Sequence, residues 1–392
     1  MKNNNQIIKD CYNKSIELLL NNSTNLGILA SSPQKRATQR NYLSIFARDA
    51  SICSLGMVVS ENKKLIKTAK NSLEILAKYQ AKNGQIPNYV KPGEKRIDFW
   101  RIGCIDSSLW WLVALKFYDK YSGDKKLYKK LQPNIEKAIN WLFCQEHPND
   151  GLLIQNEASD WADIMPRDGK VLYANSLWFK VKELYNLENK KLTKQSFNNL
   201  FYPFNDNLEK IKKCESSTIN LILKNKKLKN HYLSFANYLF YGKDIDVFGN
   251  SLAIFFKLSD KEILKNIIDF ISDKKILKNK PIAALYNPIK KDLKLWRKYM
   301  ESHNQNSPYK YHNGGIWPFV SCFFVCALVS VGKKQEAEKE LEKIAIANKL
   351  SNWRFSEWIN GKTGRLAGMR GQSWNAGMFI FACNYLYKNV KL

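Results

Sequence analysis

Apolar residues recur along most of this chain at spacings of three and four, the period of an amphipathic α-helix. In residues 64–80, for example, Leu65, Ala69, Leu73 and Leu76 fall on one face. Residues 107–121 are instead strongly apolar and aromatic, as a buried helix would be. The same pattern predicts further helices at 125–145, 175–187, 216–223, 250–256, 260–272, 317–331, 334–348 and 373–387.

More polar predicted helices alternate with more apolar ones, and Gly, Asp, Asn and aromatic residues fill the turns between them. About a dozen alternating helices with few short strands favour an all-α fold, a toroid of helical hairpins with an inner and an outer ring. No Pro/Ser-rich linker divides the chain, so we expect a single domain over residues 1–392. Residues 187–230, rich in Asn, Lys and Leu, are the weakest part of this pattern and are a candidate flexible insertion.

Composition narrows the class of protein. The chain is 45% hydrophobic and 13% aromatic, enough for a large core. No segment approaches the roughly 20 uncharged apolar residues of a membrane span, and the N-terminus lacks the apolar region of a signal peptide. The eight cysteines are scattered without zinc-site spacing, so we expect free thiols in a reducing cytoplasm, and no metal.

The formal net charge is +28, yet only 10 of the 63 basic residues are arginine. The lysines are spread along the predicted helices, and the basic runs are not interleaved with aromatic residues. Specific nucleic-acid sites favour arginine forks and stacking rings. We therefore expect solvated helix faces and no specific nucleic-acid or membrane partner, with non-specific polyanion binding at low salt.

Two acidic segments are rich in aromatic residues. Glu357 lies between Phe355 and Trp358, ahead of a glycine-rich turn, and Asp160 and Asp163 flank Trp161 far upstream. Glycosidic bonds are cut by paired carboxylates, one acting as acid and one as base. The sequence therefore suggests a glycoside hydrolase. Asp160 and Asp163 would share one face if their segment were helical, so either could be the acid. The simpler alternative for Glu357 is a carboxylate that caps a helix start.

Further polar and aromatic residues gather at predicted helix starts. If these starts lie at the same end of successive hairpins, their side chains line one mouth of the toroid. Simpler roles are open to several of them: Asp106 and His312 could cap helices, and the tryptophans could belong to the core. The residues concerned are Arg48, Asp49, Asp106, Trp110, His312, Asn313 and Trp317.

Several motifs resemble those of the alkaline/neutral invertases and, more loosely, of the wider six-hairpin glycosidases, which include trehalases, glucosidases and glycogen-debranching enzymes. They are Phe46-Ala-Arg-Asp49, Ile105-Asp-Ser-Ser-Leu-Trp-Trp111, Tyr311-His-Asn-Gly-Gly-Ile-Trp-Pro318, Glu357 with Asn360-Gly-Lys-Thr-Gly364, and Gln372-Ser-Trp374. The resemblance runs from about residue 40 to the C-terminus. It implies an (α/α)6 barrel and an inverting mechanism without a cofactor.

The resemblance also implies roles for individual residues. It places the base at Glu357 and the acid at Asp163, with Asp160 as the alternative one helical turn away. The implied sugar-binding residues are Arg48, Asp49, Asp106, Trp110, Trp161, His312, Asn313, Trp317, Gln372 and Trp374.

The segment after Asp163 departs from the invertase pattern, because it lacks consecutive arginines followed by a glycine and tyrosine run. The expected substrate is therefore a small α-glucoside or sucrose. Two alternatives share the helical toroid: a sugar epimerase, which generally uses paired histidines where this chain has four histidines in all, and a non-catalytic carbohydrate-binding relative. The chain could also form a homo-oligomer.

Overall fold

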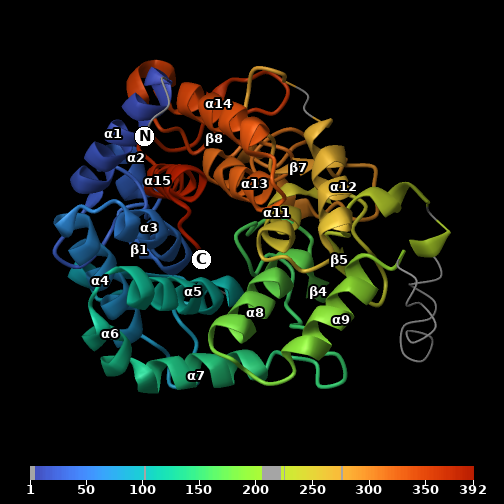
Figure 1. Ribbon diagram of the computed structural model, residues 1–392, viewed down its shortest axis with the longest axis horizontal. Helices are drawn as coiled ribbons and strands as arrows, with labels where there is room; N and C mark the ends of the chain where they lie inside the picture. Colours follow the sequence, from blue (N-terminus) through green and yellow to red (C-terminus); the bar gives the residue numbers. More distant parts are fainter. Residues whose placement is uncertain (1–4, 101–102, 205–221, 225, 275–276) are drawn as a thin grey trace.

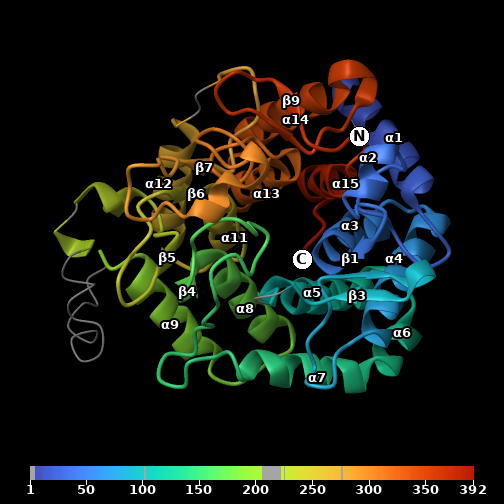
Figure 2. The ribbon, with the colours of Figure 1, turned by 180° about the vertical axis from the view of Figure 1, so that it is seen from behind.

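The helices form two concentric rings (Figures 1 and 2). The computed structural model describes residues 5–100, 103–204, 222–224, 226–274 and 277–392. Within these ranges the inner ring consists of α3 (Ala47–Val59), α5 (Ile105–Tyr121), α8 (Leu172–Leu184), α11 (Val247–Phe255), α13 (Pro318–Ser330) and α15 (Ser373–Lys388). The outer ring consists of α1 (Gln6–Asn22), α4 (Lys63–Lys78), α7 (Gln132–Phe143), α9 (Lys190–Phe201), α12 (Lys261–Ser272) and α14 (Lys334–Trp353).

The inner ring is closed. Each inner helix packs against the next in chain order, and α15 packs against α3, so the last inner helix meets the first. Glycines allow this last contact: a Cβ on Gly56 of α3 would lie 1.9 Å from the carbonyl oxygen of Gly377 in α15. The (α/α)6 toroid predicted from the sequence is confirmed.

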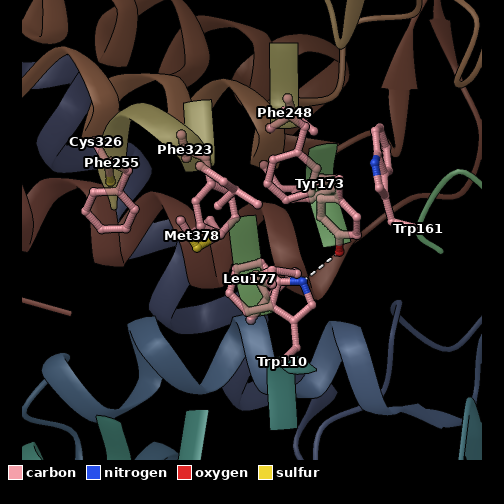
Figure 3. Close-up of a cluster of buried hydrophobic side chains, with 14 of the residues drawn as sticks. Trp110, Trp161, Tyr173, Leu177, Phe248, Phe255, Phe323, Cys326 and Met378 are labelled. Atoms are coloured by element: carbon pink, nitrogen blue, oxygen red, sulfur yellow. Dashed lines mark hydrogen bonds between the residues drawn. The ribbon is translucent and has the colours of Figure 1, made fainter. Parts of the chain in front are cut away.

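Burial follows the predicted alternation of helices. The inner helix α13 buries nearly all its residues, whereas the outer helix α4 buries one stripe that includes Leu65, Leu73 and Leu76. Aromatic side chains from several inner helices meet in the centre (Figure 3). The Trp110 ring lies 5.4 Å from that of Phe323, and its Nε1 donates a hydrogen bond of 2.7 Å to Tyr173 Oη.

The structure corrects several predicted boundaries. Residues 125–145 form two helices, α6 (Lys125–Lys130) and α7, because a new helix starts beside Pro133, which cannot donate a backbone hydrogen bond. Helix α9 occupies part of the segment in which a flexible insertion was expected, and α1 had not been predicted. The helix predicted at 216–223 lies almost wholly outside the described residues. The remaining short helices are α2 (Lys35–Gln39), η1 (Pro92–Glu94), η3 (Lys226–Asn230) and η4 (Lys298–Asn304).

Short antiparallel strand pairs lie in the loops that lead into the inner helices. The strands are β1 (Ile45–Phe46), β2 (Tyr89–Lys91), β3 (Arg96–Asp98), β4 (Lys170–Val171), β5 (Phe235–Ala236), β6 (Ile245–Asp246), β7 (Leu285–Tyr286), β8 (Trp358–Ile359) and β9 (Leu366–Ala367). They pair as β1–β2–β3, β4–β5, β6–β7 and β8–β9. Strands β1, β4 and β6 are followed directly by α3, α8 and α11, so pairing fixes where these inner helices begin. Among the described helices, none combines the length and apolar character needed to cross a membrane.

Candidate active site

A cavity of about 300 Å³ opens where several inner helices begin. Arg48 and Asp49 reach it from the first turn of α3, Trp317 from the residue before α13, and Trp374 from the first turn of α15. Its lining residues are Arg40, Asn41, Tyr42, Phe46, Arg48, Asp49, Asn88, Tyr89, Arg96, Asp98, Trp100, Trp161, Asp163, Tyr311, His312, Trp317, Glu357 and Trp374. Most of the residues singled out in the sequence therefore meet in one place.

Glu357 is held firmly on the cavity wall. Its side chain is buried, with Oε1 accepting a hydrogen bond of 2.5 Å from Tyr42 Oη and Oε2 one of 2.8 Å from the backbone N–H of Met369. The second bond requires a close backbone approach at Gly368, whose φ is +74° and where a Cβ would lie 2.3 Å from Glu357 Oε2. Glu357 precedes β8 and does not start a helix, so the simpler role of helix cap does not apply.

Burial raises the pKa of Glu357 above its ordinary value. Four interactions oppose this rise in pKa by favouring the charged form. They are the hydrogen bonds from Tyr42 and Met369 and the positive charges of Arg36 and Arg40. These contacts stabilise the ionised carboxylate against the effect of burial.

Asp163 lies in the loop before β4, and its side chain is 38% exposed. Its Oδ1 lies 3.6 Å from His312 Nδ1. Desolvation by the surrounding walls raises the pKa of Asp163 to about 7; Arg48 opposes this rise, and the negative charge of Glu357 adds to it. Near neutral pH, about half of the protein molecules would therefore carry a proton on Asp163.

Arg48 links two acidic residues beside the cavity. Its Nη1 lies 3.3 Å from Asp106 Oδ2, and its Nε lies 3.6 Å from Asp49 Oδ2. Asp106 is fully buried and also accepts a 3.0 Å hydrogen bond from Tyr173, so it contacts Arg48 from behind the cavity wall. Asp49 lines the cavity itself, and burial raises its pKa to about 7.

Aromatic side chains form much of the wall. The His312 ring stacks on Trp317 at 5.1 Å with an interplanar angle of 15°, and Trp161 meets both rings edge-on. Burial, together with the charges of Arg167 and Arg48, lowers the pKa of His312 well below its ordinary value. A neutral imidazole and indole faces are suited to stacking and hydrogen bonding with a sugar ring.

Asp160 does not face the cavity. Its segment is a loop and not a helix, so the two aspartates do not share a helix face. Arg167 donates to Asp160 Oδ1 at 2.8 Å, and Asp160 Oδ2 accepts a 3.0 Å bond from Gln155. Of the two aspartates, only Asp163 lines the cavity.

Three other candidates from the sequence lie behind the wall rather than on it. Trp110 is part of the aromatic core shown in Figure 3. Asn313 is fully buried and bonds to the backbone N–H and C=O of Ile289, both at 2.8 Å. Gln372 is buried just before α15. None of the three is among the residues that line the cavity.

Some lining residues were not indicated by any sequence pattern. Tyr42, Asn88, Asp98 and Trp100 reach the cavity from irregular segments and from the β2–β3 hairpin. The backbone of Trp100 has a φ of +58°, which residue type and spacing do not predict. Over the part of the chain that the structure describes, no three His, Cys, Asp or Glu side chains converge as they would around a metal ion.

The closed double ring of helices, with a carboxylate-bearing cavity where the inner helices begin, defines a six-hairpin glycosidase fold. The chain belongs to the amylo-alpha-1,6-glucosidase family, whose pattern matches residues 36–380. The resemblance to six-hairpin glycosidases drawn from the motifs is thereby confirmed.

Individual relatives are distant. The chain is 24% identical over 349 residues to alkaline/neutral invertase C, mitochondrial, of Arabidopsis thaliana, covering 78% of this chain and 52% of the relative. It is 23% identical over 329 residues to neutral/alkaline invertase 1, mitochondrial, of Oryza sativa subsp. japonica, covering 71% and 50%. The chain thus spans about half the length of these curated relatives.

Solved structures share the fold. The GH63 mannosylglycerate hydrolase from Thermus thermophilus, in complex with Tris and D-glycerate, matches with a TM-score of 0.67 at 12% identity. The match covers 95% of this chain and 99% of that chain. An uncharacterized conserved protein from the same organism matches with a TM-score of 0.68 at 13% identity, with the same coverage.

Proposed function

We propose that this protein hydrolyses a small α-glucoside or sucrose with inversion at the anomeric carbon. In this mechanism Asp163 protonates the leaving oxygen while Glu357 removes a proton from the attacking water. The observation that carries the proposal is that these two carboxyl groups line one cavity in different surroundings.

The surroundings suit the two roles. Desolvation raises the pKa of Asp163 to about 7, so a large fraction carries the proton that an acid must donate. Glu357 receives two hydrogen bonds to its oxygens, which favour the ionised form required of a base. Asp160 is paired with Arg167 away from the cavity, which supports Asp163 as the acid.

The cavity also limits the substrate. A volume of about 300 Å³ is at the lower end of ligand pockets, which supports a mono- or disaccharide-sized ligand over a long polymer. The indole walls of Trp161, Trp317 and Trp374 would pack against the apolar faces of a sugar ring. Arg48 and Asp49 would hydrogen-bond its hydroxyls.

A sugar epimerase is the less favoured candidate. Epimerisation on helical toroids generally employs two histidines, and among the described residues His312 is the only histidine lining the cavity. A binding-only relative is disfavoured by the presence of both carboxyl groups in one cavity.

The test is a hydrolysis panel of sucrose, trehalose, maltose, isomaltose and glucosylglycerate, with the anomer of the released sugar followed by NMR. Both Asp163→Asn and Glu357→Gln should lower kcat by at least about a hundredfold. The matched control is Glu17→Gln, since Glu17 lies exposed on α1 and pairs with Lys14. Near-full activity in either active-site variant would remove that residue from its role, and a retained anomer would exclude inversion.

A further inference from the structure

A second and larger cavity has walls that differ from those of the candidate active site. Its volume is about 960 Å³, and the two cavities have no lining residue in common. Its walls come from residues 239–244 between β5 and β6, from Lys274 just past the end of α12, and from residues 286–295, which begin with the last residue of β7, with Tyr309 beside them. These elements lie side by side on the yellow and orange part of the ring in Figures 1 and 2.

Aromatic and positively charged side chains share this cavity. Its rings are Phe240, Tyr241, Tyr286 and Tyr309, and its cations are Lys243, Lys274, Lys290 and Lys294. The lining holds two aspartates, Asp244 and Asp292, against the four lysines. The cavity is therefore positively charged and has flat apolar faces.

The lysines here are free of carboxylate partners. Within the described ranges none of the four forms an ion pair, whereas neighbouring Lys291, outside the lining, pairs with Glu301 at 3.1 Å. Lys243 instead lies over the Tyr241 ring at 5.3 Å. Ammonium groups held near aromatic rings, without an anion, are suited to a ligand that brings the anion.

Asp244 adds a hydrogen-bond acceptor to this cavity. The residue is 5% exposed, and its Oδ1 accepts a 2.8 Å hydrogen bond from Ser234. Its Oδ2 is buried and has no hydrogen-bond partner among the described residues. A buried carboxylate oxygen left without a donor is costly, so a ligand hydroxyl or amine reaching it would stabilise the site.

We propose that this cavity binds a phosphorylated sugar, either free or as the ribose phosphate of a mononucleotide. The lysines would pair with the phosphate, the tyrosine and phenylalanine rings would pack on the ring of the ligand, and Asp244 would accept from a hydroxyl or amine. Both ligand sources share this chemistry, and the cavity is large enough for either. The site is independent of the proposed hydrolysis.

The test is isothermal titration calorimetry at physiological ionic strength with four probes: glucose 6-phosphate, AMP, glucose and inorganic phosphate. One phosphorylated probe should bind at least roughly tenfold more tightly than inorganic phosphate, the contribution of one charge-assisted hydrogen bond. Tighter binding of glucose 6-phosphate would identify a free sugar phosphate, and tighter binding of AMP a nucleotide.

Variants assign the binding to this cavity. The exposed pair Lys243→Gln/Lys290→Gln should weaken binding roughly tenfold or more. The matched pair Lys64→Gln/Lys129→Gln removes the same charge from exposed positions on α4 and α6 and should leave it unchanged. Asp244→Asn should weaken the phosphorylated probe but not inorganic phosphate, and Asp163→Asn should bind normally because it lies in the other cavity.

The proposal is overturned if neither phosphorylated probe binds, or if inorganic phosphate binds equally well. It is also overturned if the control pair loses as much affinity as the cavity pair. Loss of binding in Asp163→Asn would place the ligand in the candidate active site instead.

Discussion

Asp163 and Glu357 are both carboxyl groups that line one cavity, yet they have different neighbours. Glu357 receives two hydrogen bonds, from Tyr42 and from the backbone of Met369. Asp163 has His312 Nδ1 at 3.6 Å, and that imidazole is largely neutral because burial lowers its pKa. At the scale of single residues, hydrogen bonding and desolvation therefore divide the two groups between base and acid.

The first residue-scale prediction concerns pH. An acid must be protonated, and Asp163 loses its proton as pH rises through about 7. We expect kcat/KM to fall above that pH, with an acidic limb set by Glu357, measured as a pH profile of the free enzyme. A profile that stays flat to pH 9 would contradict the assignment of Asp163.

The same shift acts on stability. The pKa of Asp163 in the folded state lies above the ordinary value of 3.8. The contribution of Asp163 to the free energy of unfolding is therefore fully present below pH 3.8 and is lost as pH rises through about 7. Asp163→Asn removes the titrating carboxyl group and therefore this pH-dependent loss of stability. Its Tm relative to the wild type should therefore be higher at pH 8 than at pH 5, a comparison that does not depend on activity.

Tyr42 provides a second prediction at this scale. Tyr42→Phe removes the 2.5 Å hydrogen bond that lowers the pKa of Glu357. We expect kcat to fall by roughly tenfold or more and the acidic limb of the pH profile to move to higher pH. Tyr12→Phe is the control, because its hydroxyl contacts Asn384 away from the cavity. Loss of kcat without movement of the limb would contradict a positioning role for Tyr42.

At the scale of elements, Arg167 joins two segments that the sequence does not link. Its Nη2 donates to Asp160 Oδ1 and its Nη1 to Asp246 Oδ2, both at 2.8 Å. Asp246 also caps α11 through the backbone N–H of Gly249. The loop that carries Asp163 is thereby fixed to the start of an inner helix.

Arg167→Met should therefore unfold the protein more easily. It leaves two buried carboxylates without their cation, at a cost of about 3–5 kcal/mol. Chemical denaturation measures this change. Arg297→Met is the control, since its partner Glu157 is about a quarter exposed and that pair should contribute about 1 kcal/mol or less. An equal loss of stability in both variants would contradict a larger contribution from the buried ion pairs of Arg167.

At the scale of the whole molecule, the ring must close between α15 and α3. Gly56→Ala would place a Cβ 1.9 Å from the Gly377 carbonyl oxygen, so the two helices must move apart. We expect a loss of about 1–3 kcal/mol in the free energy of unfolding. Gly93→Ala, where a Cβ meets nothing within 4 Å, should be nearly neutral. A Gly56→Ala variant as stable as Gly93→Ala would show that the contact tolerates a methyl group.

Much of the architecture was predictable from the sequence, because the pattern of apolar residues along a helix shows which of its faces are buried. The stripe of Leu65, Leu73 and Leu76 indicates one buried face, and the strongly apolar run of 107–121 indicates burial on most sides. Alternation of the two kinds predicts a double ring. The motifs around Arg48, His312 and Glu357 indicated which segments meet at the cavity, and the structure brings these residues together.

Contacts between segments that are distant in the sequence could not be predicted from any local pattern. Tyr42 donates to a carboxylate 315 residues away, and Arg167 selects Asp160 as its partner, leaving Asp163 on the cavity wall. Trp110 and Trp317 look alike in sequence, yet one lies in the core and the other on the wall. Periodicity and residue type act locally, so the sequence was enough to predict most of the helices, their alternation and the candidate carboxylates. Only the tertiary structure decided which side chains face one another, because that depends on how the closed ring packs.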